Sequence, residues 1–362
     1  MPVSAVRPAL QNAPAEGFSD FLAPLADLND KTVLITGGTG SFGKAFVRKV
    51  CARYRPRKLI VFSRDELKQY HMAQEFPAEH GGFMRYFIGD VRDAARLQMA
   101  FRGVDVVIHA AALKQVPTAE YNPFECIKTN VLGAENVVNA AIHAGVKRVV
   151  ALSTDKAANP INLYGASKLA SDKIFCAAEA MAGDAGTRFS VVRYGNVLGS
   201  RGSVVDLFQK LVSQGAAELP ITDDRMTRFW ITLDQGVNFV LSSLAMMKGS
   251  EIFVPKIPST RTAELASAMA PGLRQKIVGI RPGEKLHEIM ISEDDARSTV
   301  EFADRYVILP SGQLRRREEY LADGAVPVEE SFSYASNRNP QGLDARGLQA
   351  LLTRALEASS GS

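Results

Sequence analysis

The sequence predicts an α/β fold with a doubly wound parallel sheet and a smaller C-terminal domain. Between residues 31 and 193, short apolar runs rich in Val and Ile alternate with longer segments of helical periodicity, which is the pattern of a parallel sheet covered by helices on both faces. After residue 194 this alternation gives way to a mixed region rich in Pro and Gly. The chain has 362 residues, of which 46% are hydrophobic, so it can form one large unit or two smaller domains.

Six runs are expected to form the strands: residues 32–35, 59–62, 84–88, 104–109, 148–152 and 189–193. The segments between them, such as 122–144 and 163–181, carry an apolar stripe and polar positions that can face water. Right-handed crossovers through these helices give the doubly wound arrangement. Further helices are expected near 204–213, 233–246 and 262–269, and the mixed charges of 314–319 indicate a solvated helix or loop.

Three segments describe the expected domain organisation. Residues 1–30 are rich in Ala and Pro and predict a flexible N-terminal arm, with an apolar patch at Phe18, Phe21 and Leu22 that can dock locally. Residues 31–194 form the doubly wound domain. Residues 195–362 mainly form the substrate-binding domain and a tail, and some of these later segments are expected to return to the first domain.

Charge and cysteine content exclude several classes of protein. The 43 basic residues nearly balance the 39 acidic ones without a basic stripe, so we expect no nucleic-acid partner. The three cysteines have no metal-ligand spacing, so no metal site is expected. No apolar run of about 18 residues and no signal peptide occur, so we expect a cytoplasmic protein with no membrane partner.

A glycine-rich turn follows the first expected strand and precedes a helix, in the sequence TGGTGSFG over residues 36–43. Glycines keep such a turn tight and let the backbone approach a pyrophosphate, whose charge meets the free N–H groups of the next helix. The strand before it and the helix after it are the context that a Rossmann dinucleotide site requires. The expected contacts are Gly37, Thr39, Gly40, Ser41, Phe42 and Gly43.

The end of the second strand favours NADP over NAD. An NAD enzyme usually has an acidic residue there for the ribose 2′-hydroxyl, whereas this chain has Ser63, Arg64 and, slightly later, Lys68. Arg can hold a 2′-phosphate with a two-pronged contact. Alternatively, Arg64 forms an ion pair with Asp65 or Glu66 at the solvent-exposed start of a helix. Asp65 and Glu66 are themselves expected to be among the cofactor-binding residues.

The next two strands end in further candidate cofactor contacts. Asp90 and Val91 follow the third strand and suit an adenine edge and face, although Asp90 also suits a helix cap. Small side chains after the fourth strand, at Ala110, Ala111 and Ala112, let a cofactor lie against the strand end. The histidine before them, His109, is interpreted as structural.

Tyr164 and Lys168 form the expected reaction centre. Their four-residue spacing places them one turn apart on one face of a helix. A tyrosine of pKa about 10 needs about 4 kcal/mol to titrate three units lower, and one ammonium about 4 Å away at an effective dielectric near 20 supplies roughly that. The pair can thus deprotonate an alcohol while its hydride leaves for nicotinamide.

These features together resemble the extended short-chain dehydrogenases/reductases. The stretch STDKAANPINLYG over residues 153–165 closely resembles the inverting UDP-N-acetylglucosamine 4,6-dehydratases that begin pseudaminic acid synthesis for flagellin or surface glycan modification. The resemblance covers residues 30 to 310 and includes HAAALK (109–114), RYGNVLGSRG (193–202), RMTRFW (225–230) and RPGEKLHE (281–288). The extra N-terminal arm is the main difference.

The resemblance implies a role for each residue of the centre. Tyr164, helped by Lys168 and Thr154, would oxidise C4, which acidifies the C5 hydrogen; Lys156 would then remove that proton and Asp155 would protonate the departing C6 hydroxyl. The hydride would return to C6, with no net redox change. Lys156 must be neutral to act as a base, while the Asp155 carboxylate favours its charged form. Burial or a protonated Asp155 would relieve this conflict, and a simple ion pair capping a loop is the alternative.

The resemblance also implies a site for UDP-N-acetylglucosamine. Val197 joins the NADP contacts, and the substrate contacts would be Lys114, Asn196, Arg201, Val205, Thr222, Arg228, Arg281 and Glu284. A nucleotide-sugar 4-epimerase, a dehydratase that retains C5 configuration and a protein that only senses NADP are the alternatives. The C5 outcome and the tolerance for other UDP-sugars stay open, and we expect a homo-oligomer.

Overall fold

The computed structural model of the chain describes residues 19–77, 82–183, 186–310 and 314–360. Its centre is a ten-stranded sheet with the order β16-β14-β15-β10-β6-β5-β4-β1-β2-β3. Seven neighbouring strands are parallel: β3 (Met84–Ile88), β2 (Lys58–Ser63), β1 (Thr32–Thr36), β4 (Val106–His109), β5 (Arg148–Thr154), β6 (Arg188–Tyr194) and β10 (Ile252–Pro255). The predicted doubly wound α/β class is therefore confirmed.

Three antiparallel strands extend the sheet beyond β10: β15 (Arg305–Ile308), β14 (Thr299–Glu301) and β16 (Val326–Pro327). The main sheet therefore takes four strands from the region after residue 194. The central strands are apolar runs buried on both faces, as parallel strands between two helix layers must be.

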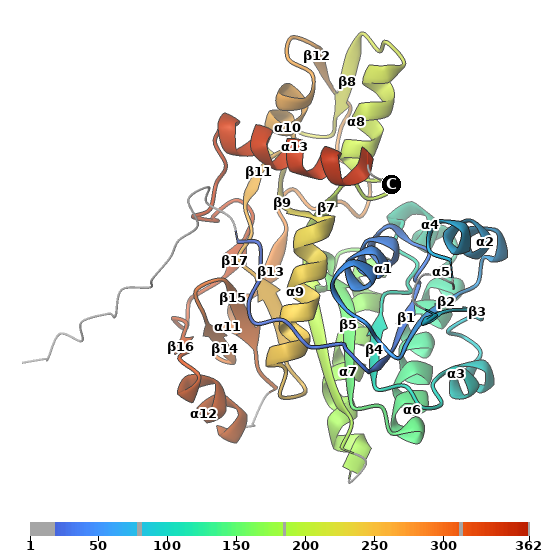
Figure 1. Ribbon diagram of the computed structural model, residues 1–362. Coiled ribbons are helices and arrows are strands. Elements are labelled where there is room, and N and C mark those ends of the chain that lie inside the picture. Colours follow the sequence, from blue (N-terminus) through green and yellow to red (C-terminus); the bar gives the residue numbers. More distant parts are fainter. Residues whose placement is uncertain (1–18, 78–81, 184–185, 311–313, 361–362) are drawn as a thin grey trace, which may run out of the picture.

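Helices cover both faces of the sheet (Figure 1). They are α1 (Ser41–Arg53), α2 (Glu66–Glu75), α3 (Ala94–Ala100), α4 (Val116–Tyr121), α5 (Pro123–Ile127), α6 (Gly133–Ala144), α7 (Leu163–Ala182) and α9 (Leu233–Met246). Local sequence fixes several of their ends. Asn162 caps α7 by accepting a hydrogen bond from the Gly165 N–H at 2.7 Å, and Gly145 ends α6 in the left-handed conformation at φ 65°.

The expected helix over 122–144 contains a π-helical segment, Lys128–Leu132, between α5 and α6. Asn130 in this segment bonds the backbone of Leu113 on both sides, accepting from its N–H at 2.8 Å and donating to its carbonyl at 2.9 Å. It also donates to the Ser167 hydroxyl on α7 at 2.9 Å. The segment thus joins the loop after β4 to α7.

A second lobe lies at one end of the main sheet (Figure 1). It contains α8 (Val204–Ser213), α10 (Thr262–Met269), α13 (Ala345–Ser360), a three-stranded sheet of β11 (Ser259–Arg261), β9 (Thr227–Thr232) and β7 (Asn196–Leu198), and a pair of β8 (Glu218–Ile221) with β12 (Arg274–Ile277). β13 (Ile289–Ile291), which pairs with β17 (Tyr334–Ala335), precedes the short helix α11 (Glu293–Ala296).

The structure describes two of the chain's outer segments about which the sequence raises an expectation, and in the first the expected local docking is made by Phe21 but not by Leu22. Phe21 is buried at 2% exposure, with its ring 4.8 Å from that of Phe239 on α9, so residues 19–30 are packed on the main domain. Leu22 is 58% exposed, and Phe18 lies outside the described residues. The charged segment 314–319 is the first part of a helix, α12 (Leu314–Ala322), and its residues 315–319 are exposed or partly exposed, so the expected solvated helix is confirmed; the next residue, Tyr320, is fully buried.

Candidate active site

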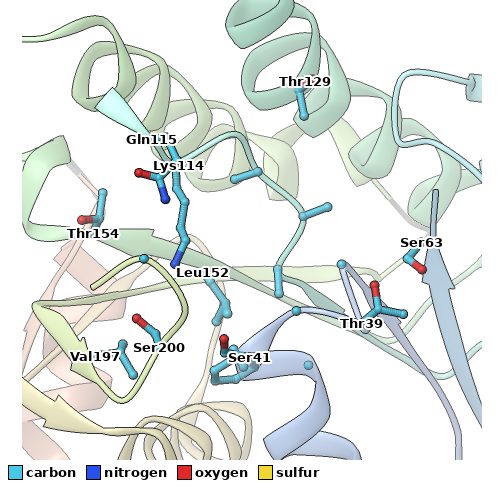
Figure 2. Close-up of a pocket in the computed structure, with 18 of the residues that line it drawn as sticks. Thr39, Ser41, Ser63, Lys114, Gln115, Thr129, Leu152, Thr154, Val197 and Ser200 are labelled. Carbon is cyan, nitrogen blue, oxygen red and sulfur yellow. The ribbon is translucent and has the colours of Figure 1, made fainter. Parts of the chain in front are cut away.

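A cavity of about 550 Å³ opens at the carboxyl ends of β1, β2, β4, β5 and β6. This edge of a doubly wound sheet is where such folds bind their ligands. Figure 2 shows Thr39 and Ser63 toward one end of the cavity and Thr154 toward the other, with the Lys114 side chain reaching in near the Thr154 end. The cavity is therefore long enough to bring the glycine-rich turn and the expected reaction centre into one space.

The glycine-rich turn forms one wall of this cavity. Gly37 has φ +66°, and a Cβ on it would lie 2.8 Å from the backbone nitrogen of Ala111, so only glycine fits between the two strand ends. α1 begins after Gly40 without a side-chain cap, which leaves its first N–H groups available to an anion. Of the turn residues expected to contact a cofactor, all line the cavity: Gly37, Thr39, Gly40, Ser41, Phe42 and Gly43.

The cations after β2 lie at the rim of the same cavity. Ser63, Arg64, Asp65 and Lys68 all line it, whereas Glu66 does not. Arg64 pairs with neither Asp65 nor Glu66, the partners considered from sequence. Its guanidinium lies 3.6 Å from Asp90, with half of the side chain exposed.

Asp65 and Lys68 pair with each other. The Asp65 carboxylate caps α2 by accepting from the Lys68 N–H at 2.9 Å, and it pairs with the Lys68 amine at 2.7 Å. The cationic character of this corner therefore rests mainly on Arg64.

The ends of β3 and β4 complete the expected cofactor half of the cavity. Asp90 and Val91 line it, as do Ala110, Ala111 and Ala112, and Val197 lies on the opposite side. His109 is 1% exposed and its Nδ1 lies 2.8 Å from the Thr36 hydroxyl. Burial, with a smaller contribution from Lys168, lowers the pKa of His109 to about 3. It is therefore a neutral structural residue at neutral pH.

Tyr164 and Lys168 lie one turn apart on α7, and both line the cavity although they are largely buried. The Lys168 amine donates to the Leu152 carbonyl at 2.6 Å. Burial raises the pKa of Tyr164 to about 12, against the charge of Lys156 and a hydrogen bond with Thr154. The expected lowering of this pKa by Lys168 is wrong for this structure, because desolvation of the phenolate outweighs the charges that face it.

The loop after β5 brings two acids to one lysine. Asp155, Lys156 and Ala157 form a single 3-10 turn, η2 (Asp155–Ala157), against the start of α7. The Lys156 amine lies 3.0 Å from Asp155 Oδ1 and 3.2 Å from Oε1 of Glu288, which precedes β13. The Thr154 hydroxyl donates to Asp155 Oδ1 at 2.9 Å. Lys156 lines the cavity, whereas both carboxylates lie behind it, fully buried.

The two carboxylates have opposite pKa shifts. Burial raises the pKa of Asp155, and the charge of Glu288 adds to this rise while Lys156 opposes it. Burial also acts on Glu288, but Lys156, Arg228 and Lys285 together hold its pKa below the usual value. For Lys156, burial favours the neutral form, yet the charges of Asp155 and Glu288 outweigh it and raise the pKa.

Burial therefore does not relieve the conflict that the sequence raised. The raised pKa of Lys156 favours its charged form, so an acceptor must take that proton before the lysine can act as a base.

The structure separates the eight expected substrate residues into groups. Lys114 and Asn196 line the cavity, and burial lowers the pKa of Lys114. Arg201 lines a neighbouring cavity of about 520 Å³ beside α1, and its carbonyl accepts from Lys114 at 3.4 Å. The remaining five line neither cavity: Val205, Thr222, Arg228, Arg281 and Glu284.

The Arg228 side chain already forms hydrogen bonds within the protein. Its guanidinium donates to the carbonyls of Lys285 at 2.9 Å and Leu286 at 3.2 Å, and it is 7% exposed. Arg281 is the opposite case, since its side chain is 59% exposed and lies 3.9 Å from Glu284. Neither residue faces the cavity in this structure.

Several lining residues were not expected from sequence, among them Gln115, Thr129, Ser200 and Ser203. Thr129 reaches the wall because it lies in the π-helical segment. Glu288 was part of the RPGEKLHE motif but received no role, because its proximity to Lys156 depends on long-range packing. In the described part of the chain, no cluster of three metal-ligating side chains occurs, and no helix is long and apolar enough to cross a membrane.

Comparisons with known proteins agree with this geometry. Residues 33–310 match the family model described as "Polysaccharide biosynthesis protein". The "UDP-N-acetylglucosamine 4,6-dehydratase (inverting)" of Campylobacter jejuni is 59% identical over 318 residues, which cover 86% of this chain and 94% of that protein. The "UDP-glucose 4-epimerase" of Rickettsia canadensis is 42% identical over 334 residues, 89% of this chain and 95% of that protein.

Solved structures share the fold. Pen from Bacillus thuringiensis superposes with a TM-score of 0.83 at 33% identity, covering 91% of this chain and 98% of that one. A double mutant of the dTDP-glucose 4,6-dehydratase DesIV from Streptomyces venezuelae, solved with NAD and DAU bound, has a TM-score of 0.63 at 26% identity over 70% of this chain and 86% of that one. The chain therefore belongs to the polysaccharide biosynthesis protein family of nucleotide-sugar enzymes, which have the short-chain dehydrogenase/reductase fold.

Proposed function

We propose that this chain is a UDP-N-acetylglucosamine 4,6-dehydratase that inverts C5. The observation that carries the proposal is the buried Asp155–Lys156 pair, 3.0 Å apart, beside Tyr164 at one end of the cavity. An epimerase that only oxidises and reduces C4 has no step that needs such an acid and base. The inverting dehydratase from Campylobacter jejuni, at 59% identity, supports the same assignment.

Each residue of the centre has one task in this reaction. Tyr164 takes the proton of the C4 hydroxyl, and the resulting ketone acidifies the C5 hydrogen. This step requires the charge of Lys156, the Thr154 hydrogen bond and a positively charged nicotinamide ring to offset the burial that raises the pKa of Tyr164. Lys156 then removes the C5 proton, and Asp155, whose raised pKa suits an acid, donates its proton to the departing C6 oxygen. Lys168, one turn further along the same face of α7, is held by the Leu152 carbonyl at 2.6 Å.

The cavity fits a nicotinamide dinucleotide. The close approach of Gly37 to Ala111 and the uncapped start of α1 are features that a bound pyrophosphate requires. When bound, this cofactor would accept a hydride from C4 and return it to C6, so no net oxidation remains. A proton that reaches C5 from the face opposite to the one that lost it completes the product and inverts that centre. NADP is favoured because the end of β2 presents Ser63 and Arg64 to the cavity, while the nearby Asp65 is paired with Lys68.

The preference for NADP is tested by replacing Arg64 with Ala. We expect the apparent Kd for NADP to rise by about tenfold or more, because a two-pronged phosphate contact is lost, while the Kd for NAD changes little. Both are measured by titration of the purified protein. An equal effect on both cofactors would mean that Arg64 does not recognise the 2′-phosphate.

Turnover of UDP-N-acetylglucosamine in deuterated water tests the function itself. NMR and mass spectrometry of the product should show a 4-keto-6-deoxy sugar with deuterium at C5 and inverted configuration. A 4-epimer that keeps all its oxygens would make the protein an epimerase, and deuterium at C5 with unchanged configuration would make it a retaining dehydratase.

Two further expectations belong to this proposal. Residues 195–362 supply most of the nucleotide-sugar contacts, of which Asn196 lines the cavity in this structure. The protein acts as a homo-oligomer, which the exposed rings of Tyr121 and Phe124 support, at 88% and 78% exposure.

A further inference from the structure

Glu288 lies deep behind the proposed reaction centre and is not explained by the steps above. It comes from the segment before β13, far in sequence from the loop after β5. Its N–H donates to the Ser336 hydroxyl at 2.9 Å and its carbonyl accepts from the Ser336 N–H at 2.8 Å, so the backbone is fixed on both sides. The carboxylate is fully buried, with one oxygen 3.2 Å from the Lys156 amine.

Lys156 is therefore held between two buried carboxylates. Its amine lies 3.0 Å from Asp155 and 3.2 Å from Glu288. The second oxygen of each acid, Asp155 Oδ2 and Glu288 Oε2, is buried without a hydrogen-bond partner. A buried polar atom without a hydrogen bond lowers the stability of the folded protein. Each of these two oxygens is therefore available to bind a proton.

The charges around Asp155 and Glu288 determine which of the two accepts a proton from Lys156. Glu288 faces three cations: Lys156, Arg228 at 3.7 Å and Lys285 at 3.8 Å. Among the ion pairs of the described residues, Asp155 faces Lys156 alone, and its other polar neighbour is the Thr154 hydroxyl. Three cations stabilise the ionised form of Glu288, whereas Asp155 loses its one cation whenever Lys156 is neutral. A proton leaving Lys156 is thus more stable on Asp155 than on Glu288.

We propose that Glu288 is a positioning residue, a fixed negative charge that anchors the Lys156 amine and directs its proton to Asp155. The inference rests on the proposed dehydratase function. Transfer of one proton across the 3.0 Å contact converts the ion pair into a neutral lysine and a protonated acid. These are the two forms that the elimination needs.

The elimination then balances without another proton donor or acceptor. The C5–H bond breaks and its proton binds Lys156, the electron pair forms the C5–C6 double bond, and the C6–O bond breaks as the Asp155 proton passes to the leaving oxygen. Lys156 is then an ammonium again beside two carboxylates, and Glu288 has stayed ionised throughout. Its charge also stabilises the ammonium that forms as the C5–H bond breaks.

A substrate-free experiment tests the electrostatic part of the proposal. The variant Glu288→Gln keeps the shape of the side chain and removes its charge. Brief acetic anhydride pulses from about pH 6 to about pH 10, read by peptide mass spectrometry, report the fraction of neutral Lys156. We expect Lys156 to react at a pH about one unit lower or more in the variant. Identical curves in both proteins would overturn the proposal.

A matched control removes another buried carboxylate. Glu251 is also fully buried and accepts from the Ser190 hydroxyl at 3.0 Å, outside the cavity. The variant Glu251→Gln should leave the Lys156 curve unchanged. If Glu288→Gln does not fold, as judged by circular dichroism, Glu288→Asp keeps the charge but withdraws it by one methylene, and a smaller shift in the same direction is expected.

Turnover separates a positioning role from a structural one. With UDP-N-acetylglucosamine in deuterated water, Glu288→Gln should still oxidise C4 in a single turnover, while deuterium entry at C5 slows about tenfold or more. The pH optimum of C5 exchange should move lower, because Glu288 raises the pKa of both Asp155 and Lys156. The other groups facing this cluster, the cations Arg228 and Lys285 and the neutral Tyr164 phenol, are unchanged.

Equal loss of both steps, or unchanged C5 exchange, would overturn the proposal. If the unaltered protein makes no 4-keto sugar, the proposed function fails. The acetylation curves then still decide whether Glu288 holds the charge of Lys156.

Discussion

At the scale of single residues, the proposed chemistry depends on Asp155, Lys156 and Glu288, whose protonation states influence one another because the three groups are in contact and shielded from water. Lys156 is 25% exposed at its side chain, while the acids on either side of it are fully buried. The lysine is thus the only member of this trio, among the described residues, that both lines the cavity and contacts the other two. Its role as a base can be removed without touching the cofactor half of the cavity.

Replacing Lys156 with Ala should leave NADP binding unchanged and abolish water loss from UDP-N-acetylglucosamine. The base is removed, while the glycine-rich turn and Arg64 stay in place. Binding is measured by titration calorimetry and water loss by NMR of the product. The control Lys256→Ala removes a lysine that pairs with Glu301 at 2.6 Å outside the cavity. Full dehydratase activity in Lys156→Ala would show that another group is the base.

His109 should make the stability of the protein depend on pH. Its folded pKa of about 3 lies below the ordinary value of 6.5, so protons bind the unfolded chain first as the pH falls. Its contribution to stability is complete above about pH 6.5 and decreases as the pH falls toward 3. Urea unfolding at about pH 7.5 and about pH 5 should show a smaller loss of stability for His109→Asn than for the unaltered protein. The exposed His143→Asn should behave like the unaltered protein.

The sequence identifies residues whose function follows from local spacing. The glycines of the turn, the cations after β2 and the pair Tyr164 and Lys168 all line the cavity at the expected places. Glu288 and Thr129 could not be found in this way, because one acts across a long-range contact and the other through a π-helical segment. The pKa of Tyr164 was also misjudged, because spacing gives the distance between two charges but not the cost of burying them.

At the scale of elements, α7 is the part that joins the reaction centre to the sheet. A Cβ on Gly165 would collide with the Lys156 carbonyl, so the helix packs directly on the turn η2. Further along the same helix, Asp172 accepts from the Ser153 hydroxyl at 2.8 Å and from Arg193 on β6 at 3.1 Å, and all three are buried. Arg193 in turn donates to the Met290 carbonyl on β13 at 2.8 Å. One buried ion pair thus connects α7, β6 and β13.

Replacing Asp172 with Asn should lower the free energy of unfolding by about 3 kcal/mol or more, because a buried guanidinium loses its counter-charge. The measurement is urea or thermal unfolding followed by circular dichroism. The control is Glu218→Gln, which removes the partner of Lys276 in an ion pair with both side chains partly exposed, and a change of about 1 kcal/mol or less is expected there. A similar small change for Asp172→Asn would mean that the pair does not anchor α7.

The ends of helices could be predicted from the sequence where the hydrophobic periodicity and the capping residues agree. The helices α8, α9 and α10 have the bounds expected from sequence, and α9 begins with a capping box of Thr232 and Gln235. The π-helical segment was not predicted, since one extra residue in a turn leaves the apolar stripe nearly unchanged over a short window. The antiparallel strands β14, β15 and β16 were also missed, because nothing local shows which sheet a short strand joins.

At the scale of the whole molecule, the cavity lies where the main sheet meets the second lobe. The glycine-rich turn and α7 come from the sheet, whereas Asn196, Ser200 and Ser203 come from the connection into the lobe. Arg228, Arg281 and Glu284 remain outside the cavity in this arrangement. The segment that carries Arg281 and Glu284 already contacts the centre, since the Gly283 carbonyl accepts from Asn162 at 2.7 Å and Lys285 donates to the Ala158 carbonyl at 2.6 Å.

The assembly state is predicted to be a homo-oligomer. The side chains of Tyr121 and Phe124 are exposed where α4 meets α5. A second copy of the chain that packs here would remove this apolar surface from water. Light scattering should give a multiple of the chain mass, and the double variant Tyr121→Glu with Phe124→Glu should shift it toward one copy. A monomer mass for the unaltered protein would remove this expectation.

The two ends of the described chain meet, since both Asp20 carboxylate oxygens lie 2.7 Å from the Arg354 guanidinium. Phe21, next to Asp20, packs against Phe239. During synthesis, therefore, Asp20 and Phe21 leave the ribosome well before their partners Arg354 and Phe239. At about 5–20 residues per second, that interval is on the order of half a minute. The first six strands can pair meanwhile, so the N-terminal segment closes over a sheet that already exists rather than starting it.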